Sequence, residues 1–421
     1  MLKSTIKPKI LIRSIPVGGQ DQLAEELRRF KVDDRLSQQI MAAATPVRLV
    51  IESITAATAA LLRQQMQQLG GEAMIGAPTG EAAAAGQSCC LLAGTKRQVE
   101  ELLAGLERQT DPALQQVGHD MRLTLARLSS NPPPLTIGPL TCDWGKRTYV
   151  MGILNVTPDS FSEDGLLSQA NWLDAVVQQA RQMVRDGADM LDIGGESTRP
   201  GSQPVSQAEE LRRVIPAIKA VAAEFEVAIS VDTYKAEVAR QAIAAGAHMI
   251  NDVWGLRMDA DMAAVAAAYG VPVIVMHNRS RPKDAVQEAK LGGRYVGVEY
   301  NHLLADILGE LQASIELGLA AGVAEEKIII DVGIGFGKTV EQNLMLLNQL
   351  AEFRVLGRPI LIGTSRKSFI GYTLDLPPAE RVEGTGATVA LSIERGADIV
   401  RVHNVREMVR VARMTDALVR G

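Results

Sequence analysis

The sequence predicts an α/β protein in which a small α/β domain precedes a (β/α)8 TIM barrel. A length of 421 residues is more than one small core needs. Three prolines in the run NPPP (residues 131–134) prevent helix continuation and stiffen a connector. Downstream of it, a helix–glycine–strand unit recurs. We therefore expect a small α/β domain of unknown role over 1–130, a Pro-rich linker leading into the barrel over 131–147, and the barrel over 148–421.

The recurring unit is a helix that ends in Gly-Ala and leads into a strand with polar residues at its end. It is clearest in RQMVRDGADMLDIGGES, RQAIAAGAHMINDVWG and LSIERGADIVRVHNV. We expect Gly187, Gly246 and Gly396 to close their helices in the left-handed conformation, which costs least without a Cβ atom. The apolar run after each glycine is short and continuous, which is typical of a parallel strand buried on both faces.

Eight such strands are expected, and helical sequence follows each one, in the size and order of a (β/α)8 barrel. They lie near residues 148–156, 189–193, 227–232, 248–252, 271–277, 328–332, 359–363 and 398–403. A doubly wound open sheet would usually carry a glycine-rich dinucleotide turn after its first strand, where this chain has NVTPDSF. The later GIGFGK (residues 333–338) lacks full dinucleotide or Walker spacing.

The N-terminal region predicts a small α/β domain without chemistry of its own. Short apolar runs (KILIRSI, VRLVIESI, SCCLLAG) alternate with helical stretches such as DQLAEELRRF and KRQVEELLAGLERQ. The stretch GAPTGEAAAAGQ is expected to be a loop. No cluster of titratable groups is evident, and the domain could serve oligomerisation.

Composition excludes several classes of protein. A net charge of −5 argues against a nucleic-acid binder, which needs a basic excess. The three cysteines form no CxxC pair or zinc-type spacing, which fits a reducing cytoplasm. The N-terminus lacks a signal-peptide apolar region, and no segment gives about 18 uninterrupted apolar residues. We expect a cytoplasmic protein with neither nucleic acid nor membrane as partner.

Polar side chains follow every predicted strand of the barrel. In such barrels the carboxyl ends of the strands form the active site. Taken singly, Asp192 or Asp252 could cap a helix or accept backbone amides, and His277 could be a satisfied core histidine. Because all eight strands converge on one mouth, we predict a site there. The strand-end residues are Asn155, Asp192, Asp232, Thr233, Asn251, Asp252, His277, Asn278, Asp331, the segment GTSRKS (363–368), Arg401, His403 and Asn404.

The residue types indicate the ligands. Asp232, Asn251 and Asp331 suit a flat, nitrogen-rich ring that presents N–H donors. Cationic or potentially cationic side chains suit an anion, and arginine matches phosphate oxygens well; they are Arg199, Lys367, Arg401 and His403. Hard oxygen ligands suit Mg²⁺ carried by a pyrophosphate; they are Asn155, Asp159, Glu163 and Asp192. No Ser or Cys with a positioned base suggests a covalent nucleophile. The set favours displacement of a phosphate-type leaving group.

Seven segments of this half also match one known family, in its order and spacing. They are MGILNVTPDSFS, DIGGESTRPGS, ISVDT, INDV, GIGFGKT, GTSRKSFIG and RVHNV. Residues 135–421 resemble dihydropteroate synthase. The resemblance implies a transferase of folate biosynthesis that joins 6-hydroxymethyl-7,8-dihydropterin pyrophosphate to p-aminobenzoate, by dissociative loss of pyrophosphate and attack of the aromatic amine. It also implies a homodimer that needs Mg²⁺.

The family's motifs imply a role for each matching residue. The pterin would be bound by Asp232, Asn251, Met276, Asp331, Lys367 and Arg401. The pyrophosphate would be held by Asn155, Arg401 and His403, with Asn155 as the Mg²⁺ ligand. The p-aminobenzoate would contact Thr198, Arg199, Pro200, Phe336 and Ser368. Asp331, Lys367, Arg401 and Asn155 would carry the catalysis.

Three positions depart from the family pattern. Val332 stands where proline is common, and Asn404 stands where aspartate is usual, which removes a charge beside His403. Glu163 stands where a shorter aspartate is common, so a metal role there is in doubt. None of the three removes a principal binding residue.

Two alternative functions remain open. A methyltransferase acting between methyltetrahydrofolate and a corrinoid shares the barrel and the Asp/Asn pterin floor, but it does not need the SRKS and STRPG segments found here. A catalytically silent pterin-binding protein, with the N-terminal domain as an interaction module, would not need Arg199, Lys367, Arg401 and His403 intact.

Overall fold

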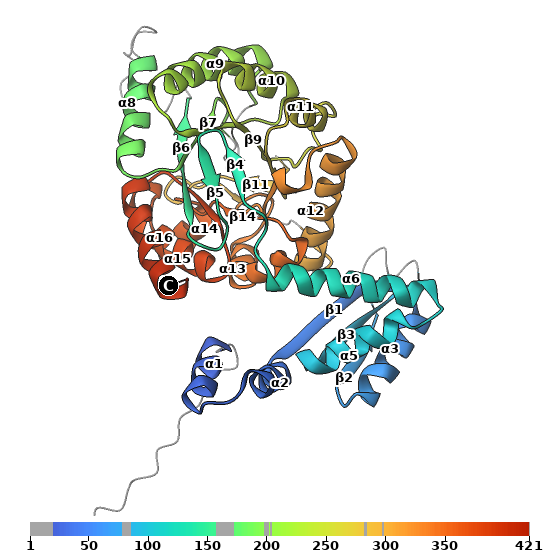
Figure 1. Ribbon diagram of the computed structural model, residues 1–421. Helices are drawn as coiled ribbons and strands as arrows, with labels where there is room; N and C mark the ends of the chain where they lie inside the picture. Colours follow the sequence, from blue (N-terminus) through green and yellow to red (C-terminus); the bar gives the residue numbers. More distant parts are fainter. Residues whose placement is uncertain are drawn as a thin grey trace, which may run out of the picture. The chain divides into compact units, whose positions relative to one another are not determined.

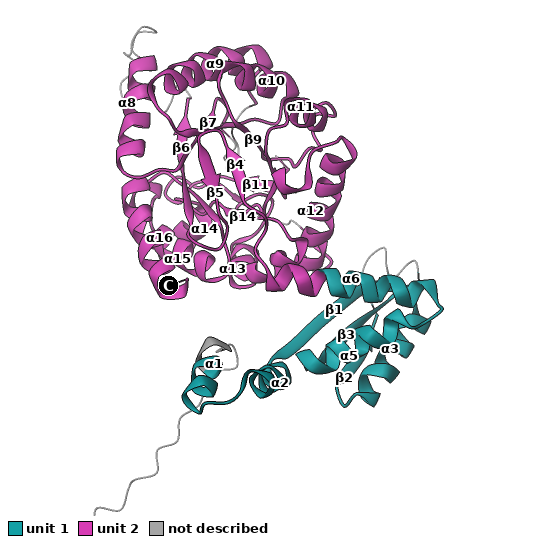
Figure 2. Ribbon diagram, in the orientation of Figure 1, with its two compact units in different colours: residues 1–123 teal, residues 124–421 magenta. Residues whose placement is uncertain are grey.

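The computed structural model describes residues 20–77, 86–156, 172–197, 202, 204–281, 284–296 and 299–420 (Figure 1). The chain divides into two compact units, Met1–Leu123 and Thr124–Gly421, and the boundary falls within helix α6 (Pro112–Ser129) (Figure 2). The apolar run KILIRSI lies outside the described residues, as does most of the predicted loop GAPTGEAAAAGQ.

The first unit is a small α/β domain, as predicted. Its antiparallel sheet has the order β1-β3-β2, and helices α3 and α5 pack on it. The apolar faces meet in a core that includes the fully buried Leu62, Met66, Leu92, Leu102 and Leu106. The elements are α1 (Gln20–Arg29), α2 (Asp34–Ala44), β1 (Pro46–Ile54), α3 (Ala56–Gln68), β2 (Glu72–Gly76), β3 (Ser88–Thr95), α5 (Lys96–Glu107) and α6.

The second unit confirms the predicted TIM barrel. Eight parallel strands close in the order β10-β13-β14-β15-β6-β7-β8-β9. They are β6 (Tyr149–Asn155), β7 (Met190–Gly194), β8 (Ala228–Asp232), β9 (Met249–Asp252), β10 (Val273–Met276), β13 (Ile328–Asp331), β14 (Ile360–Ile362) and β15 (Ile399–Val402). Gly187, Gly246 and Gly396 have φ angles of 99°, 119° and 92°, the left-handed conformation expected of them.

Helices surround the barrel (Figure 1). Their bounds are α8 (Trp172–Arg185), α9 (Gln207–Glu224), α10 (Ala236–Ala245), α11 (Met262–Tyr269), α12 (Leu303–Ala320), α13 (Val340–Asn348), α14 (Ser368–Leu374), α15 (Val382–Glu394) and α16 (Val405–Val419). Within the described ranges, none of the helices combines the length and apolar character needed to cross a membrane.

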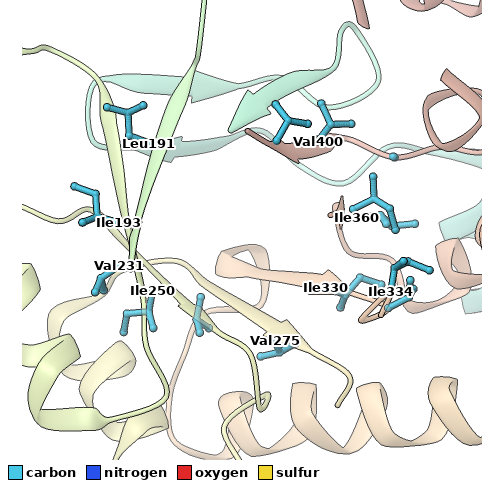
Figure 3. Packing of buried hydrophobic residues seen from close by; sticks show 14 of the residues in the cluster. Leu191, Ile193, Val231, Ile250, Val275, Ile330, Ile334, Ile360 and Val400 are labelled. Atoms are coloured by element: carbon cyan, nitrogen blue, oxygen red, sulfur yellow. The ribbon is translucent and has the colours of Figure 1, made fainter. Parts of the chain in front are cut away.

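Strand residues alternate between two apolar layers, as the period of two requires. One set, including Leu191, Ile250 and Val400, packs between the strands and the helices (Figure 3). The other set joins a separate core inside the barrel, formed by Tyr149, Met151, Met190, Ala228, Met249, Ile274, Ile329, Leu361 and Ile399. The barrel interior at the amino-terminal halves of the strands is therefore packed with apolar side chains and is not a channel.

A β-hairpin precedes the first barrel strand. Its strands are β4 (Leu135–Ile137) and β5 (Leu140–Cys142), and they lie within the segment predicted to be a linker leading into the barrel. Leu135, Ile137, Cys142 and Trp144 pack into the same core as the inward side chains of the amino-terminal strand halves. Apolar side chains thus fill this end, and polar chemistry is confined to the carboxyl ends of the strands.

Candidate active site

The inward-facing row changes from apolar to mainly polar at the carboxyl ends of the strands. Because side chains alternate along a strand, the residue two positions beyond an inward apolar residue also faces inward. This rule pairs Met190 with Asp192, Met249 with Asn251, Ile274 with Met276, Ile329 with Asp331 and Ile399 with Arg401. The same rule places Ile153, Ser230 and Gly363 in the other three strands. Five of the eight residues so placed are polar or charged, and they lie toward the barrel mouth, where the site is predicted.

Arg401 crosses the barrel interior from β15 to β7 and β8. Its Nε donates to Asp192 Oδ2 at 2.5 Å, and one Nη donates to Asp232 Oδ2 at 2.6 Å. Asn251 Nδ2 also donates to Asp192 Oδ2, at 2.9 Å. Burial disfavours the charged guanidinium, but the two carboxylates outweigh it and raise the pKa of Arg401. The predicted pterin residues of β8, β9 and β15 therefore form one connected network.

Asp331 and Lys367 form the second part of the site. Asp331 is buried, and its Oδ1 accepts the backbone N–H of Gly333 at 2.7 Å. Burial raises the pKa of Asp331, and the charge of Lys367 opposes that shift. Burial lowers the pKa of Lys367 to about 8, against the opposing charge of Asp331. The two groups are thus electrostatically coupled.

Lys367 also joins the site to the glycine-rich segment 333–338. Its Nζ donates to the carbonyl of Ile334 and lies 4.2 Å from the centroid of the Phe336 ring. Ser368 begins helix α14 directly after it and is half-buried. The structure therefore brings together Lys367, which was predicted to bind the pterin, and Phe336 and Ser368, which were predicted to contact p-aminobenzoate.

The predicted pyrophosphate residues lie at the ends of β6 and β15. Asn155 is the last residue of β6 and is half-buried. The backbone N–H of His403 donates to Ser365 Oγ at 3.1 Å, and its Nδ1 lies 3.0 Å from the same oxygen. Asn404 Oδ1 accepts from Arg366 Nε at 2.9 Å, so the departure from aspartate keeps an acceptor for that arginine.

Several predicted residues lie outside the described part of the chain. They are Thr198, Arg199 and Pro200, together with the loop residues Asp159 and Glu163. Among the residues that the structure does describe, no group of three or more His, Cys, Asp or Glu side chains could hold a metal ion.

Asp192 and Asp252 each have a structural partner. The suggested metal ligand Asp192 is fully buried and bound by Arg401 and Asn251. Asp252 accepts the backbone amides of Trp254 and Leu256 at 2.8 Å each, which is the local role considered for it.

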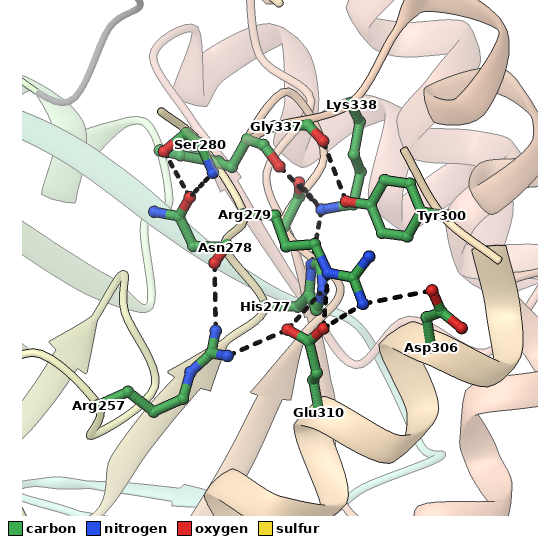
Figure 4. Close-up of polar contacts among 12 residues, drawn as sticks. Arg257, His277, Asn278, Arg279, Ser280, Tyr300, Asp306, Glu310, Gly337 and Lys338 are labelled. Carbon is green, nitrogen blue, oxygen red and sulfur yellow. Dashed lines mark hydrogen bonds and ion pairs between the residues drawn. The ribbon is translucent and has the colours of Figure 1, made fainter. Parts of the chain in front are cut away.

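Sequence reasoning missed two clusters of buried charge beside the site. Lys235 Nζ lies 2.6 Å from Glu196 Oε2 and also contacts Glu210, and Tyr234 OH donates to Glu196 Oε1 at 3.0 Å. The second cluster joins Lys338 and Glu310 through His277 (Figure 4). The lysine that ends GIGFGK was the available signal for it, but this segment was weighed as a nucleotide motif and as a family match, and no role was assigned to Lys338.

This fold and this site define a pterin-binding barrel enzyme. Residues 151–403 match the family model described as "Pterin binding enzyme". A dihydropteroate synthase of Clostridium beijerinckii is 50% identical over 287 residues, which are 68% of this chain and 100% of the relative. The chain belongs to the dihydropteroate synthase family and is a transferase of folate biosynthesis.

A solved relative agrees with this assignment. The dihydropteroate synthase of a Clostridium species (C. difficile), crystallised in the presence of pteroic acid, is 50% identical with a TM-score of 0.60; the match covers 66% of this chain and 99% of that one.

The first unit also has a counterpart. A probable bifunctional folylpolyglutamate synthase/dihydropteroate synthase of Halobacterium salinarum is 40% identical over 371 residues, which are 88% of this chain and 43% of the relative. That alignment is longer than the barrel unit, so it extends into the first unit.

Proposed function

We propose that the chain condenses 6-hydroxymethyl-7,8-dihydropterin pyrophosphate with p-aminobenzoate to give 7,8-dihydropteroate and pyrophosphate. The observation that carries the proposal is the buried inward row of Asp232, Asn251 and Asp331, with Arg401 and Lys367 beside it. Related enzymes support the substrates: one from Xanthomonas albilineans was solved with 4-aminobenzoic acid and, separately, with 7,8-dihydropteroate. The test is mass-spectrometric detection of dihydropteroate from the purified protein and both substrates.

The pterin pocket follows from the hydrogen-bonding capacity of these residues. Asp331 and Asp232 present carboxylate oxygens to ring N–H groups, and Asn251 can both donate and accept. Met276 is buried at the end of β10 and supplies an apolar wall. Arg401 already joins two of the surrounding carboxyl groups, and on the basis of the family motif it is proposed to hold the pyrophosphate as well.

The reaction needs stabilisation of separating charges and no covalent nucleophile. As the C–O bond to the pyrophosphate breaks, positive charge spreads into the pterin ring, where the negative charge of Asp331 favours it. Arg401 and His403 favour the departing anion. The amine of p-aminobenzoate then attacks the exposed methylene carbon and loses a proton. Catalysis is therefore mostly positioning and electrostatics.

The p-aminobenzoate would lie between helix α14 and the glycine-rich segment. Phe336 and Ser368 flank Lys367 there, and Phe336 offers an aromatic face. Thr198, Arg199 and Pro200 are proposed to complete this subsite on the basis of the family motif.

The oxygen ligands proposed for Mg²⁺ are sufficient only when the pyrophosphate of the substrate supplies additional ones. Mg²⁺ keeps several waters and usually binds through a few protein oxygens plus substrate phosphates. Asn155 offers one amide oxygen at the barrel mouth, while Asp192 is fully buried and its Oδ2 is bound by Arg401. The ion, when bound, would neutralise charge on the leaving pyrophosphate.

Chelation tests this. EDTA should abolish turnover, and Mg²⁺ should restore it, because pyrophosphate then leaves with its charge uncompensated. The thermal unfolding midpoint of the substrate-free protein should not change, since the residues that the structure describes include no group of His, Cys, Asp or Glu side chains that could hold a metal ion. A large loss of unfolding temperature with EDTA would contradict this role for Asn155.

The pKa of Lys367 predicts the alkaline limb of the activity. Burial lowers this pKa from 10.5 to about 8, so the folded protein favours the neutral amine. Below pH 8 the buried ammonium therefore lowers the free energy of unfolding. As pH rises through 8, the amine loses its proton and this cost is relieved. We expect kcat/KM, which reports the free enzyme, to fall above pH 8. A pH profile that stays flat to pH 10 would contradict a required Lys367 ammonium.

A homodimer and a cytoplasmic location complete the proposal. Cys89, Cys90 and Cys142 are free thiols, as a reducing compartment favours. Sedimentation velocity of the full chain tests the dimer: we expect twice the chain mass, and a monomer at assay concentration would contradict it.

A further inference from the structure

The segment 333–338 connects both halves of the site, yet no regular secondary structure holds it. Four backbone carbonyls of residues 333–337 accept hydrogen bonds from side chains. Gly333 and Phe336 bind Lys338, Ile334 binds Lys367, and Gly337 binds Tyr300. Most of its backbone hydrogen bonding is therefore set by side chains, which makes the segment sensitive to those residues.

Lys338 is the centre of this arrangement (Figure 4). It is 2% exposed, and its Nζ lies 2.8 Å from Gly333 O, 3.0 Å from Phe336 O and 2.9 Å from His277 Nδ1. An ammonium group has three N–H donors, and these three acceptors use all of them. Burial lowers the pKa of Lys338, and the nearby Asp331 opposes that shift.

The tautomer of His277 follows from its two neighbours. Burial, followed by the charge of Lys338, lowers the pKa of His277 to about 3, so the ring is neutral. Its Nε2 lies 3.3 Å from Glu310 Oε2. Glu310 is an anion: burial favours its neutral form, but its contacts with His277 and Arg279 outweigh burial and lower its pKa. The ring proton therefore belongs on Nε2, and Nδ1 is left to accept from Lys338.

The backbone is tightly packed around the contact between His277 and Lys338. Gly333 has a φ of +71°, and an added Cβ would lie 1.8 Å from the carbonyl oxygen of His277. An added Cβ on Gly335 would lie 2.8 Å from Lys367 Cδ. The segment is thus packed between the end of β10 and Lys367, so a shift at Lys338 would be passed to Lys367 and Phe336.

We propose that Lys338 is a positioning residue for the reaction. Its ammonium, oriented by neutral His277, fixes the segment 333–337. The fixed segment in turn places the Lys367 ammonium through Ile334 O and the Phe336 ring. Glu310 acts one step further away by setting the tautomer of His277. This inference rests on the proposed function, because it assigns a role within that site.

The first test is Lys338→Met, with Lys327→Met as the matched control. Lys327 lies at the opposite end of β13, where its Nζ donates to Gly270 O. We expect Lys338→Met to lower kcat/KM about 100-fold, with a higher KM for p-aminobenzoate, while Lys327→Met stays at the wild-type level. A purely structural role would lower kcat with the folded fraction and leave KM unchanged; that result would overturn the proposal.

The second test remains informative even if Lys338→Met folds poorly. His277→Asn keeps an acceptor near the Nδ1 position, and His277→Gln keeps a donor near the Nε2 position. We expect His277→Asn to retain most of the wild-type kcat/KM and His277→Gln to behave like Lys338→Met, at similar unfolding temperatures. Equal activities, or a more active His277→Gln, would overturn the proposal. An inactive wild-type protein in the same assay would instead refute the proposed function.

Discussion

Lys367→Ala should lower kcat/KM about 100- to 1000-fold while leaving the barrel folded. A preorganised cationic donor in a water-excluded site contributes an effect of this size. Lys367 is placed for it between Asp331, the carbonyl of Ile334 and the ring of Phe336. Its amine is also costly to bury in the charged form, so the fold should lose little stability without it. Steady-state kinetics and thermal unfolding measure the two effects.

Lys290→Ala is the control for this variant. Lys290 pairs with Asp375 at 2.6 Å, and its side chain is 52% exposed, so its removal should change neither activity nor stability. Wild-type activity in Lys367→Ala would show that the site is placed wrongly. A loss of activity that matches a loss of folded protein would contradict the separation of function from stability.

Arg401→Met should have the largest combined effect on stability and activity. The variant leaves Asp192, which is fully buried, and Asp232 without their arginine. Removing one partner of a buried ion pair costs about 3–5 kcal/mol. We expect the free energy of unfolding to fall by about 3 kcal/mol, near the lower end of this range, because the Arg401 side chain is 20% exposed. Activity should also fall at least 100-fold, since charge on the leaving anion loses a stabilising donor.

The two losses can be separated by a double variant. Arg401→Met combined with Asp192→Asn removes one uncompensated charge, so urea denaturation should show part of the stability restored. The double variant should remain inactive because the guanidinium is still absent. Recovery of activity together with stability would mean that Arg401 acts only through the fold.

The sequence was sufficient to predict the barrel and much of its mouth. In several strands an inward position toward the carboxyl end becomes polar after an apolar one, as in Met190 and Asp192 or Ile399 and Arg401. This pattern is local, so it is readable without knowing which strands neighbour one another. The glycines that close the helices, such as Gly246, are equally local.

The partners of these residues were not predictable, because they depend on distances across the barrel. Asp192 reads as a possible metal ligand in the sequence, but it is bound by Arg401, 209 residues away. Lys338 and His277 are 61 residues apart, and neither shows in isolation that it is buried against the other. The hairpin formed by β4 and β5 was not predictable for the same reason: its few apolar residues are explained only by their contacts with the barrel interior.

The most direct test of the proposed function is the release of pyrophosphate by the purified full chain with Mg²⁺. We expect pyrophosphate to form only when the pterin pyrophosphate and p-aminobenzoate are both present, in equal amount to dihydropteroate. Lys367→Ala serves as the matched negative control. No release from the wild-type protein, with methyl transfer from methyltetrahydrofolate to a corrinoid detected in its place, would contradict the account.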